Sequence, residues 1–117
     1  RFVFQPMLDG EKLRRYLIAR GAYLERDYTF ESDGKPYDCI VGRRRGENEK
    51  AQDYTRGEYA FGYENMREKS AAFLGRLKEK LARAEKYLGG ENLSDVSRGE
   101  LCARRDFLRG VITGEID

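Results

Sequence analysis

The apolar residues near the start of the chain fall into a short strand pattern and then a helical one. Phe2-Val3-Phe4 is a brief apolar run that Pro6 stops, because proline cannot donate to a central strand ladder. Residues 10–20 then repeat apolar side chains at helical spacing, with Asp9 placed to cap the helix and Gly21 to end it. The apolar face predicted for this helix comprises Leu13, Tyr16 and Leu17.

Two further strands and a tight turn follow. Residues 22–31 alternate in polarity, which predicts a half-exposed strand. Its predicted faces are Leu24, Arg26, Tyr28 and Phe30 on one side, and Tyr23, Glu25, Asp27 and Thr29 on the other. Ser32-Asp33-Gly34-Lys35 is a strong hairpin signal. The next strand, Tyr37 to about Arg43, contains the continuous apolar run Cys39-Ile40-Val41, which is typical of a strand buried on both faces.

These elements predict a β-α-β-β unit with the third strand in the centre. The right-handed crossover makes the first two strands parallel, and the hairpin makes the third antiparallel, so the expected spatial order is first, third, second. One helix covers only one face of such a sheet, and the outer edge of the first strand stays bare. The chain also opens in mid-strand at Arg1. We therefore expect a fragment whose sheet is completed by a missing N-terminal half or by a second copy.

The remainder of the chain predicts a polar loop and a helical hairpin. The expected domains are 1–46 for the α/β part, 47–65 for the loop and 66–117 for the hairpin. A heptad-spaced seam, indicating a coiled coil, is formed by Leu74, Leu77, Leu81, Ala84 and Leu88. Gly89-Gly90 ends this helix, and either Ser94 or Ser97 caps the next one, Ser97 through a capping box with Glu100. The second apolar line, which ends at Gly114, is Leu101, Leu108 and Ile112.

The amino-acid composition excludes several kinds of catalytic and metal site. The 117 residues are 39% hydrophobic and 38% charged, with a net charge of +2, so basic contacts must be local. The sequence contains no histidine, which excludes Ser-His-Asp and Cys-His catalysis, and two cysteines are too few for a zinc site or a disulfide framework. No apolar stretch is long enough to cross a membrane. These features favour a cytoplasmic protein without a resident metal, and Cys39 is expected to be an inert buried side chain.

Several short motifs, taken together, resemble the C-terminal half of the bacterial tRNA (adenine(22)-N(1))-methyltransferase family, TrmK. They lie in order over residues 1–62: Phe2-Val3-Phe4-Gln5-Pro6-Met7, Leu13-Arg14-Arg15-Tyr16-Leu17 with Gly21, Glu31, Asp33-Gly34-Lys35-Pro36-Tyr37-Asp38-Cys39-Ile40-Val41, and Phe61-Gly62. The resemblance implies the C-terminal part of a Rossmann-like class I methyltransferase sheet, with the last strand antiparallel and central, followed by a helical hairpin or coiled coil. It also implies an S-adenosylmethionine-dependent parent enzyme that acts on tRNA.

The resemblance assigns part of the substrate wall to Gln5, Pro6 and Met7. These residues follow the carboxyl end of a strand, where open α/β sheets bind ligands, although the same residues also suit a simple strand-terminating turn. Two features depart from the family. Tyr63 stands where a proline is expected, and the glycine-rich cofactor loop is absent from the sequence. No cofactor is therefore expected to bind this chain by itself.

Arginine clusters are the candidate RNA contacts. Arg43-Arg44-Arg45 is the densest basic run, and arginines grip phosphates through charge and bidentate geometry. The helical hairpin offers a second candidate group, Arg104, Arg105 and Arg109. Either group could also be a solvated surface. Three interpretations thus stay open. The first is the C-terminal fragment of a tRNA adenine-N1 methyltransferase, inactive alone. The second is a non-enzymatic module that binds RNA or a protein through a small α/β unit and a helical hairpin, and the third is a purely structural dimerisation domain.

Overall fold

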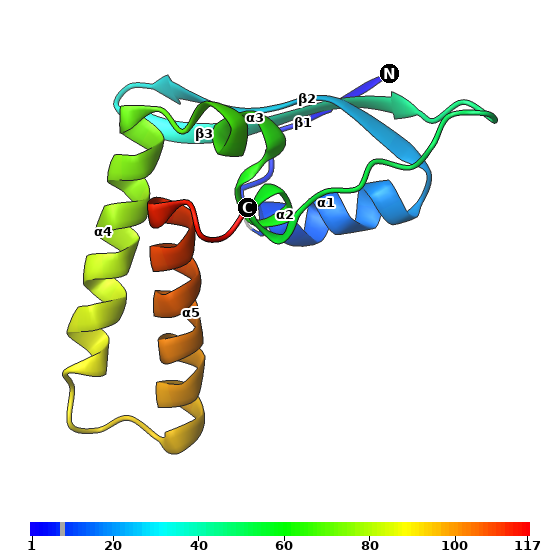
Figure 1. Ribbon diagram of the computed structural model, residues 1–117. Coiled ribbons are helices and arrows are strands. Elements are labelled where there is room, and N and C mark those ends of the chain that lie inside the picture. Colours follow the sequence, from blue (N-terminus) through cyan, green and yellow to red (C-terminus); the bar gives the residue numbers. More distant parts are fainter. Residues whose placement is uncertain (8) are drawn as a thin grey trace. The chain divides into compact units, whose positions relative to one another are not determined.

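The computed structural model describes residues 1–7 and 9–117 of the chain (Figure 1). The chain divides into two compact units, Arg1–Glu68 and Lys69–Asp117, which are described separately. The first unit contains a small sheet and three helices, and the second is a pair of long helices. No helix in the described part of the chain has the length and apolarity that a membrane crossing requires.

The sheet of the first unit has the predicted strand order. Strands β1 (Phe2–Phe4), β2 (Ala22–Ser32) and β3 (Lys35–Arg44) are arranged β1-β3-β2, and β3 is antiparallel to both neighbours. Cys39, Ile40 and Val41 of the central strand are buried, as their unbroken apolar run predicts. The mixed α/β class and the central position of the third strand are confirmed.

The hairpin between β2 and β3 is the expected tight turn. Ser32 pairs with Lys35, and the two residues between them, Asp33 and Gly34, have φ angles of 52° and 75°. Positive φ at both central positions is the type I′ geometry, which matches the twist of the flanking strands and suits an Asp-Gly sequence.

A β-bulge in β2 overturns the predicted alternation of its two faces. Leu24 pairs with Gly42 and Arg26 pairs with Val41, so Glu25 is an extra residue between them. Asp27 then pairs with Ile40, two positions from Gly42 on β3, and lies on the same face as Leu24. The sequence places these residues on opposite faces because a bulge leaves no signal in a simple alternation count.

Helix α1 (Gly10–Ala19) covers one face of the sheet and begins and ends as predicted. The Asp9 side chain accepts the Lys12 amide, and Gly21 follows the helix with φ of 89°. Its buried face, however, contains Arg14 and excludes Tyr16, which is 55% exposed. The core packed between helix and sheet is Leu17, Ile18, Ala22, Leu24, Ile40 and Tyr54.

Two short helices lie in the segment predicted as a polar loop. Helix α2 (Arg56–Phe61) begins with a capping box in which Thr55 accepts the Glu58 amide and Glu58 accepts the Thr55 amide. Helix α3 (Tyr63–Glu68) follows after Gly62, whose φ is 96°. The loop prediction is therefore corrected from residue 56 onward, and these helices belong to the first unit.

The second unit is a hairpin of two antiparallel helices, α4 (Ala71–Leu88) and α5 (Asp95–Thr113) (Figure 1). Ser94 is the N-cap of α5 and accepts the Ser97 amide, which settles the choice between the two candidate caps and overturns the Ser97 capping box. Gly114 ends α5 with φ of 84°. The buried apolar residues of the hairpin are Phe73, Leu77, Ala84, Leu108 and Val111. The coiled-coil seam itself stays a prediction.

Candidate functional site

The segment predicted to contact the substrate, Gln5–Met7, directly follows β1. Phe4 of β1 pairs with Ile40 of β3, which pairs with Asp27 of β2, so these three residues form one row across the sheet. Gln5 and Met7 follow β1 and are exposed, Met7 by 87%, while Pro6 is half-buried. Gln5 and Met7 are therefore available to a ligand.

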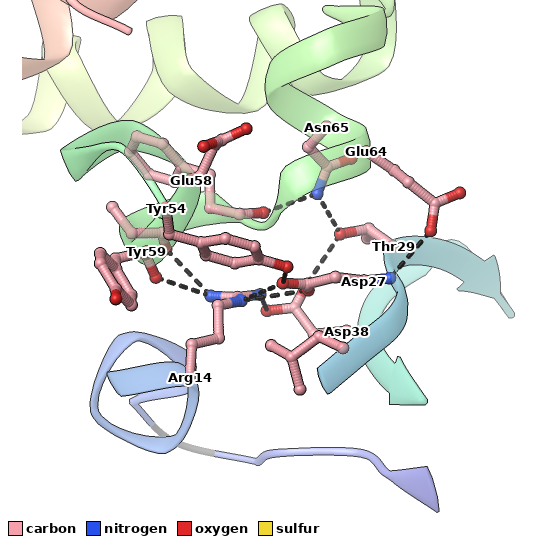
Figure 2. Close-up of polar contacts among 12 residues, drawn as sticks. Arg14, Asp27, Thr29, Asp38, Tyr54, Glu58, Tyr59, Glu64 and Asn65 are labelled. Atoms are coloured by element: carbon pink, nitrogen blue, oxygen red, sulfur yellow. Dashed lines mark hydrogen bonds and ion pairs between the residues drawn. The ribbon is translucent and has the colours of Figure 1, made fainter. Parts of the chain in front are cut away.

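A buried ion pair lies under the helical layer of this unit. Arg14 of α1 and Asp27 of β2 are each only 1% exposed. The Arg14 Nε–H lies 3.0 Å from both carboxylate oxygens of Asp27, and the Tyr54 hydroxyl donates to Asp27 Oδ2 at 3.0 Å (Figure 2). Every buried polar side-chain atom of the described residues has a partner. The pair is thus compensated, as a buried charge must be.

The remaining Arg14 donors connect the sheet and α1 to α2. Arg14 Nη1 donates to the Tyr59 and Ala60 carbonyl oxygens at 3.1 and 3.3 Å, and Nη2 donates to Asp38 Oδ2 at 3.4 Å (Figure 2). Because Arg14 holds one end of α2 by its carbonyl groups, this helix depends on a side chain from a distant part of the sequence.

Helix α3 is joined to the same network through Thr29. The Thr29 hydroxyl donates to Asp38 Oδ1 at 2.7 Å and accepts from Asn65 Nδ2 at 2.8 Å. Asn65 also donates to the Phe61 carbonyl oxygen at 2.9 Å. The network therefore ties α1, α2, α3, β2 and β3 together around one guanidinium group.

The electrostatics of the network favour a fixed structural role. Burial raises the pKa of the Asp27 carboxyl, and the Arg14 charge opposes that rise. Burial, followed by the Asp27 charge, raises the pKa of Tyr54, so its hydroxyl stays protonated and remains a donor. With the Arg14 donors directed at protein oxygens, the network is suited to positioning its surroundings rather than to acid–base chemistry.

Two glycines allow the backbone to approach the ion pair. A Cβ on Gly62 would lie 2.8 Å from Asp27 Oδ1, and a Cβ on Gly10 would lie 3.0 Å from Arg14 Nη1. Gly10 is the first residue of α1, so the network positions the start of this helix. The segment Gln5–Met7 lies in the sequence between β1 and the capped start of α1.

Tyr63, the departure from the expected proline, takes part in this arrangement. Its backbone N–H donates to the Asp27 carboxylate and opposes the rise in the pKa of that group. Proline has no N–H and could not make this bond. The substitution thus fits the network of this chain.

The outer edge of β2 is closed by side chains in place of a fourth strand. Gln52 accepts the Leu24 amide at 2.7 Å and donates to the Leu24 carbonyl oxygen at 3.0 Å. Glu64 accepts the Asp27 amide at 2.8 Å and also binds Arg26, whose hydrogen bond lowers the pKa of the Glu64 carboxyl. These side chains occupy the backbone groups of Leu24 and Asp27 that a further strand would otherwise pair with.

One arginine of the run at the end of β3 already has a carboxylate partner. Arg43 forms a bidentate pair with Glu49, both N···O distances being 2.8 Å, and lies over the Tyr23 ring. This hydrogen bonding lowers the pKa of Glu49 to about 2. Arg44 is exposed and Arg45 is half-buried. Arg44 is thus the member of the run most open to a phosphate.

The three arginines of the helical hairpin also differ in whether they have a carboxylate partner. Arg105 pairs with Asp106 at 3.1 Å and Arg109 pairs with Glu85 at 3.2 Å, both within the second unit. Arg104 is exposed. The structure therefore does not gather these side chains into a single unpaired basic cluster.

The Arg14 network is not foreseen from the sequence. Arg14 lies next to the apolar positions Leu13, Leu17 and Ile18 on the inner side of α1, and a charged residue at such a position is the one available signal. Its partner Asp27 is hidden by the bulge. In the described part of the chain, no group of acidic, cysteine or histidine side chains is arranged to hold a metal ion.

Comparison with solved structures defines the class of fold. The chain superimposes on a Streptococcus agalactiae protein of the NADB-Rossmann superfamily with a TM-score of 0.78 and 18% identity, covering 94% of this chain and 46% of that one. The fold of this chain is therefore similar to part of a Rossmann-like fold. No protein-family model matches the sequence, and no curated protein matches it.

Two further structures correspond to the family that the sequence motifs resemble. One is the B. subtilis M1A22 tRNA methyltransferase TrmK, with a TM-score of 0.74, 20% identity, and coverage of 94% of this chain and 50% of that chain. The other is M. capricolum TrmK in complex with S-adenosyl-homocysteine, with a TM-score of 0.79, 16% identity, and coverage of 95% and 48%. The resemblance to TrmK is confirmed at the level of the fold. The chain spans about half the length of these structures.

The residues present here do not fit the nucleoside cofactor by themselves. The glycines of the sequence nowhere occur as Gly-x-Gly, the spacing that lets a backbone approach a cofactor closely at a strand-to-helix turn. The charged and polar side chains around the Arg14 network are already bonded to one another.

Proposed function

We propose that this chain is the part of an S-adenosylmethionine-dependent tRNA adenine-N1 methyltransferase that forms one wall of the substrate site and contacts the tRNA. The observation that carries the proposal is the structural match over 94–95% of the chain to proteins named as TrmK. In the parent protein, the cofactor supplies a methyl group on a sulfonium, which is already electrophilic. The contribution of this chain is to bind and orient the acceptor.

Gln5, Pro6 and Met7 form the proposed wall. The Gln5 amide is exposed at the end of β1 and can both donate and accept. A glutamine amide can pair with the N6 and N7 atoms of adenine, which leaves N1 free to face the methyl donor. The exposed Met7 offers an apolar, adaptable surface for the ring. The target nucleotide must first leave its stack to reach this position.

The bare edge of β1 is the proposed junction with the rest of the parent protein. Val3 is 61% exposed and Phe4 is 42% exposed, although both belong to a strand of the sheet. An exposed apolar strand edge is a template for pairing with another strand. We assign that strand to the remainder of the methyltransferase domain, and pairing with a second copy of this chain is the competing outcome.

The proposed RNA contacts are the two arginine groups. In the first unit they are Arg43, Arg44 and Arg45, and in the hairpin they are Arg104, Arg105 and Arg109. Because Arg43, Arg105 and Arg109 have carboxylate partners, Arg44 and Arg104 are the readiest to bind phosphate. Removing one arginine that binds a phosphate should reduce the log–log salt slope of tRNA binding by about 0.7–0.9.

Methyl transfer by the complete protein tests the proposal. The complete protein, supplied with unmodified tRNA and methyl-labelled S-adenosylmethionine, is expected to label the tRNA, whereas the 117-residue chain alone is not. The Gln5→Ala variant should label the tRNA more slowly. The Tyr16→Ala variant, which changes an exposed aromatic residue of α1 outside the wall, should label it at the wild-type rate. RNA binding by the complete protein without any methyl transfer would contradict the proposal and favour an interaction module.

A further inference from the structure

A solvent-accessible cavity lies at the end of the helical hairpin where a loop joins α4 to α5. It has a volume of about 520 Å³ and lies where α4 runs into the loop before α5, drawn in yellow in Figure 1. It is lined by Arg83, Lys86, Tyr87, Gly90, Glu91, Asn92 and Leu93. This volume lies within the range of small-ligand sites. None of these side chains stands out as a ligand contact in the sequence alone.

An exposed aromatic ring and two cations dominate the cavity. Tyr87, near the end of α4, is 64% exposed. Arg83 precedes it by one helical turn, and Lys86 is its neighbour. Both cations are exposed, and neither has a carboxylate partner among the described residues. Glu91 is the acidic side chain of the lining.

The loop around the cavity is fixed by hydrogen bonds. Arg98 of α5 donates to the Leu88 carbonyl oxygen at 3.0 Å and to the Gly90 carbonyl oxygen at 3.3 Å. The Gly90 amide also donates to the Tyr87 carbonyl oxygen at 3.0 Å. Because the backbone beside Tyr87 is held from both sides, the ring has a defined support on which a ligand can stack.

We infer that this end of the hairpin is a binding site for an unpaired nucleotide of an RNA loop. The base stacks on Tyr87, a contact that every base can make through its flat face. Arg83 and Lys86 bind the adjoining phosphates. The Glu91 carboxylate accepts a hydrogen bond from an exocyclic amino group. An exposed ring beside two cations provides a stacking surface for a base and charges for its phosphates, so a nucleotide suits this lining.

The identity of the RNA as tRNA rests on the proposed function, but the site can be tested without methyl transfer. The 117-residue chain is titrated with fluorescently labelled unmodified tRNA at several salt concentrations. Tyr87→Ala is expected to weaken binding by roughly tenfold, whereas Tyr87→Phe, which keeps the stacking surface, restores it. Arg83→Gln and Lys86→Gln should each reduce the salt slope by about 0.7–0.9.

Matched controls separate a local site from general charge effects. Lys78→Gln removes one exposed charge from the same helix outside the cavity, and Tyr16→Ala removes an exposed ring from the other unit. Neither should change tRNA affinity as Tyr87→Ala does. Photocrosslinking of bound RNA that carries 4-thiouridine in its loops should label the peptide containing Tyr87.

The outcomes distinguish this inference from the proposed function. If the complete protein transfers no methyl group but Tyr87→Ala still weakens RNA binding, the nucleotide site stands and the proposed function fails. If Tyr87→Ala and the wild type bind tRNA equally and no crosslink forms at Tyr87, the nucleotide site is overturned. Equal competition by polyglutamate and by RNA would also overturn it, since it would indicate a general cation-binding surface.

Discussion

At the scale of single residues, Arg14 connects α1 to β2, β3 and α2 of the first unit. It is buried with Asp27, it holds the carbonyl groups at the end of α2, and its neighbour Gly10 begins α1. A buried ion pair is not itself strong evidence for stability, because both charges lose their hydration. Its importance here is that one guanidinium sets the positions of several elements.

Removing Arg14 should therefore destabilise the chain strongly. Arg14→Met leaves the Asp27 carboxylate buried without its partner, which costs about 3–5 kcal/mol. The loss is measured by urea unfolding followed through tyrosine fluorescence, which reports on the first unit because every tyrosine except Tyr87 lies there. Lys12→Met, an exposed change on the same helix, should cost less than about 1 kcal/mol. Equal losses in the two variants would show that the buried network is not important.

Glu49 should titrate far below an ordinary glutamate. Its hydrogen bond from Arg43 lowers the pKa to about 2 from 4.5. A carboxyl whose folded pKa is lowered contributes stability above its ordinary pKa, and that contribution disappears as the pH falls from 4.5 toward 2. NMR titration of the Glu49 side chain should give this low midpoint, and Arg43→Gln should return it toward 4.5. An unchanged midpoint in that variant would show that Arg43 is not the cause.

At the scale of elements, the passage from α2 to α3 depends on a glycine. Gly62 has φ of 96°, and a Cβ there would lie 2.8 Å from Asp27 Oδ1. Gly62→Ala is therefore expected to destabilise the first unit by about 1–3 kcal/mol in urea unfolding. The control is Gly46→Ala in the same unit, where the nearest atom to the new Cβ is 3.9 Å away, and the change should stay within about 0.5 kcal/mol. A neutral Gly62→Ala would contradict the close packing at this position.

Most elements of the first unit can be predicted from local sequence, and the exceptions have physical causes. The Asp33-Gly34 turn, the Asp9 cap and the apolar run of β3 are local signals, and the structure confirms all three. The bulge at Glu25 has no local signal, so simple alternation places Asp27 on the wrong face. Tyr16 falls on the predicted apolar face of α1 because periodicity alone does not reveal that Arg14 replaces it there.

Part of the candidate site can likewise be predicted from the sequence, and part cannot. Gln5, Pro6 and Met7 stand out through their place after a strand and through a family resemblance, and the structure shows Gln5 and Met7 exposed there. The Arg14 network joins residues from five elements, which no spacing along the chain indicates. Helices α2 and α3 escape prediction because they are short and polar, and tertiary contacts to Arg14 and Asn65 hold them.

At the scale of the whole molecule, the chain is expected to need other parts of its parent protein for cofactor binding. Its sequence lacks the glycine loop that would approach S-adenosylmethionine. Calorimetric titration of the 117-residue chain with S-adenosylmethionine should therefore show no saturable binding, while the complete protein should bind it. Saturable binding by the chain at micromolar ligand would mean that these residues form a cofactor site of their own.

The proposed role of this chain is to serve the methylation of adenine N1 in tRNA. The most direct test is nucleoside analysis of unmodified tRNA after incubation with the complete protein and S-adenosylmethionine. Digestion and mass spectrometry should yield 1-methyladenosine, recognised by its conversion to N6-methyladenosine in alkali, and the Gln5→Ala variant should yield less of it. Methylation confined to another nucleoside, or no methylated nucleoside at all, would contradict this role.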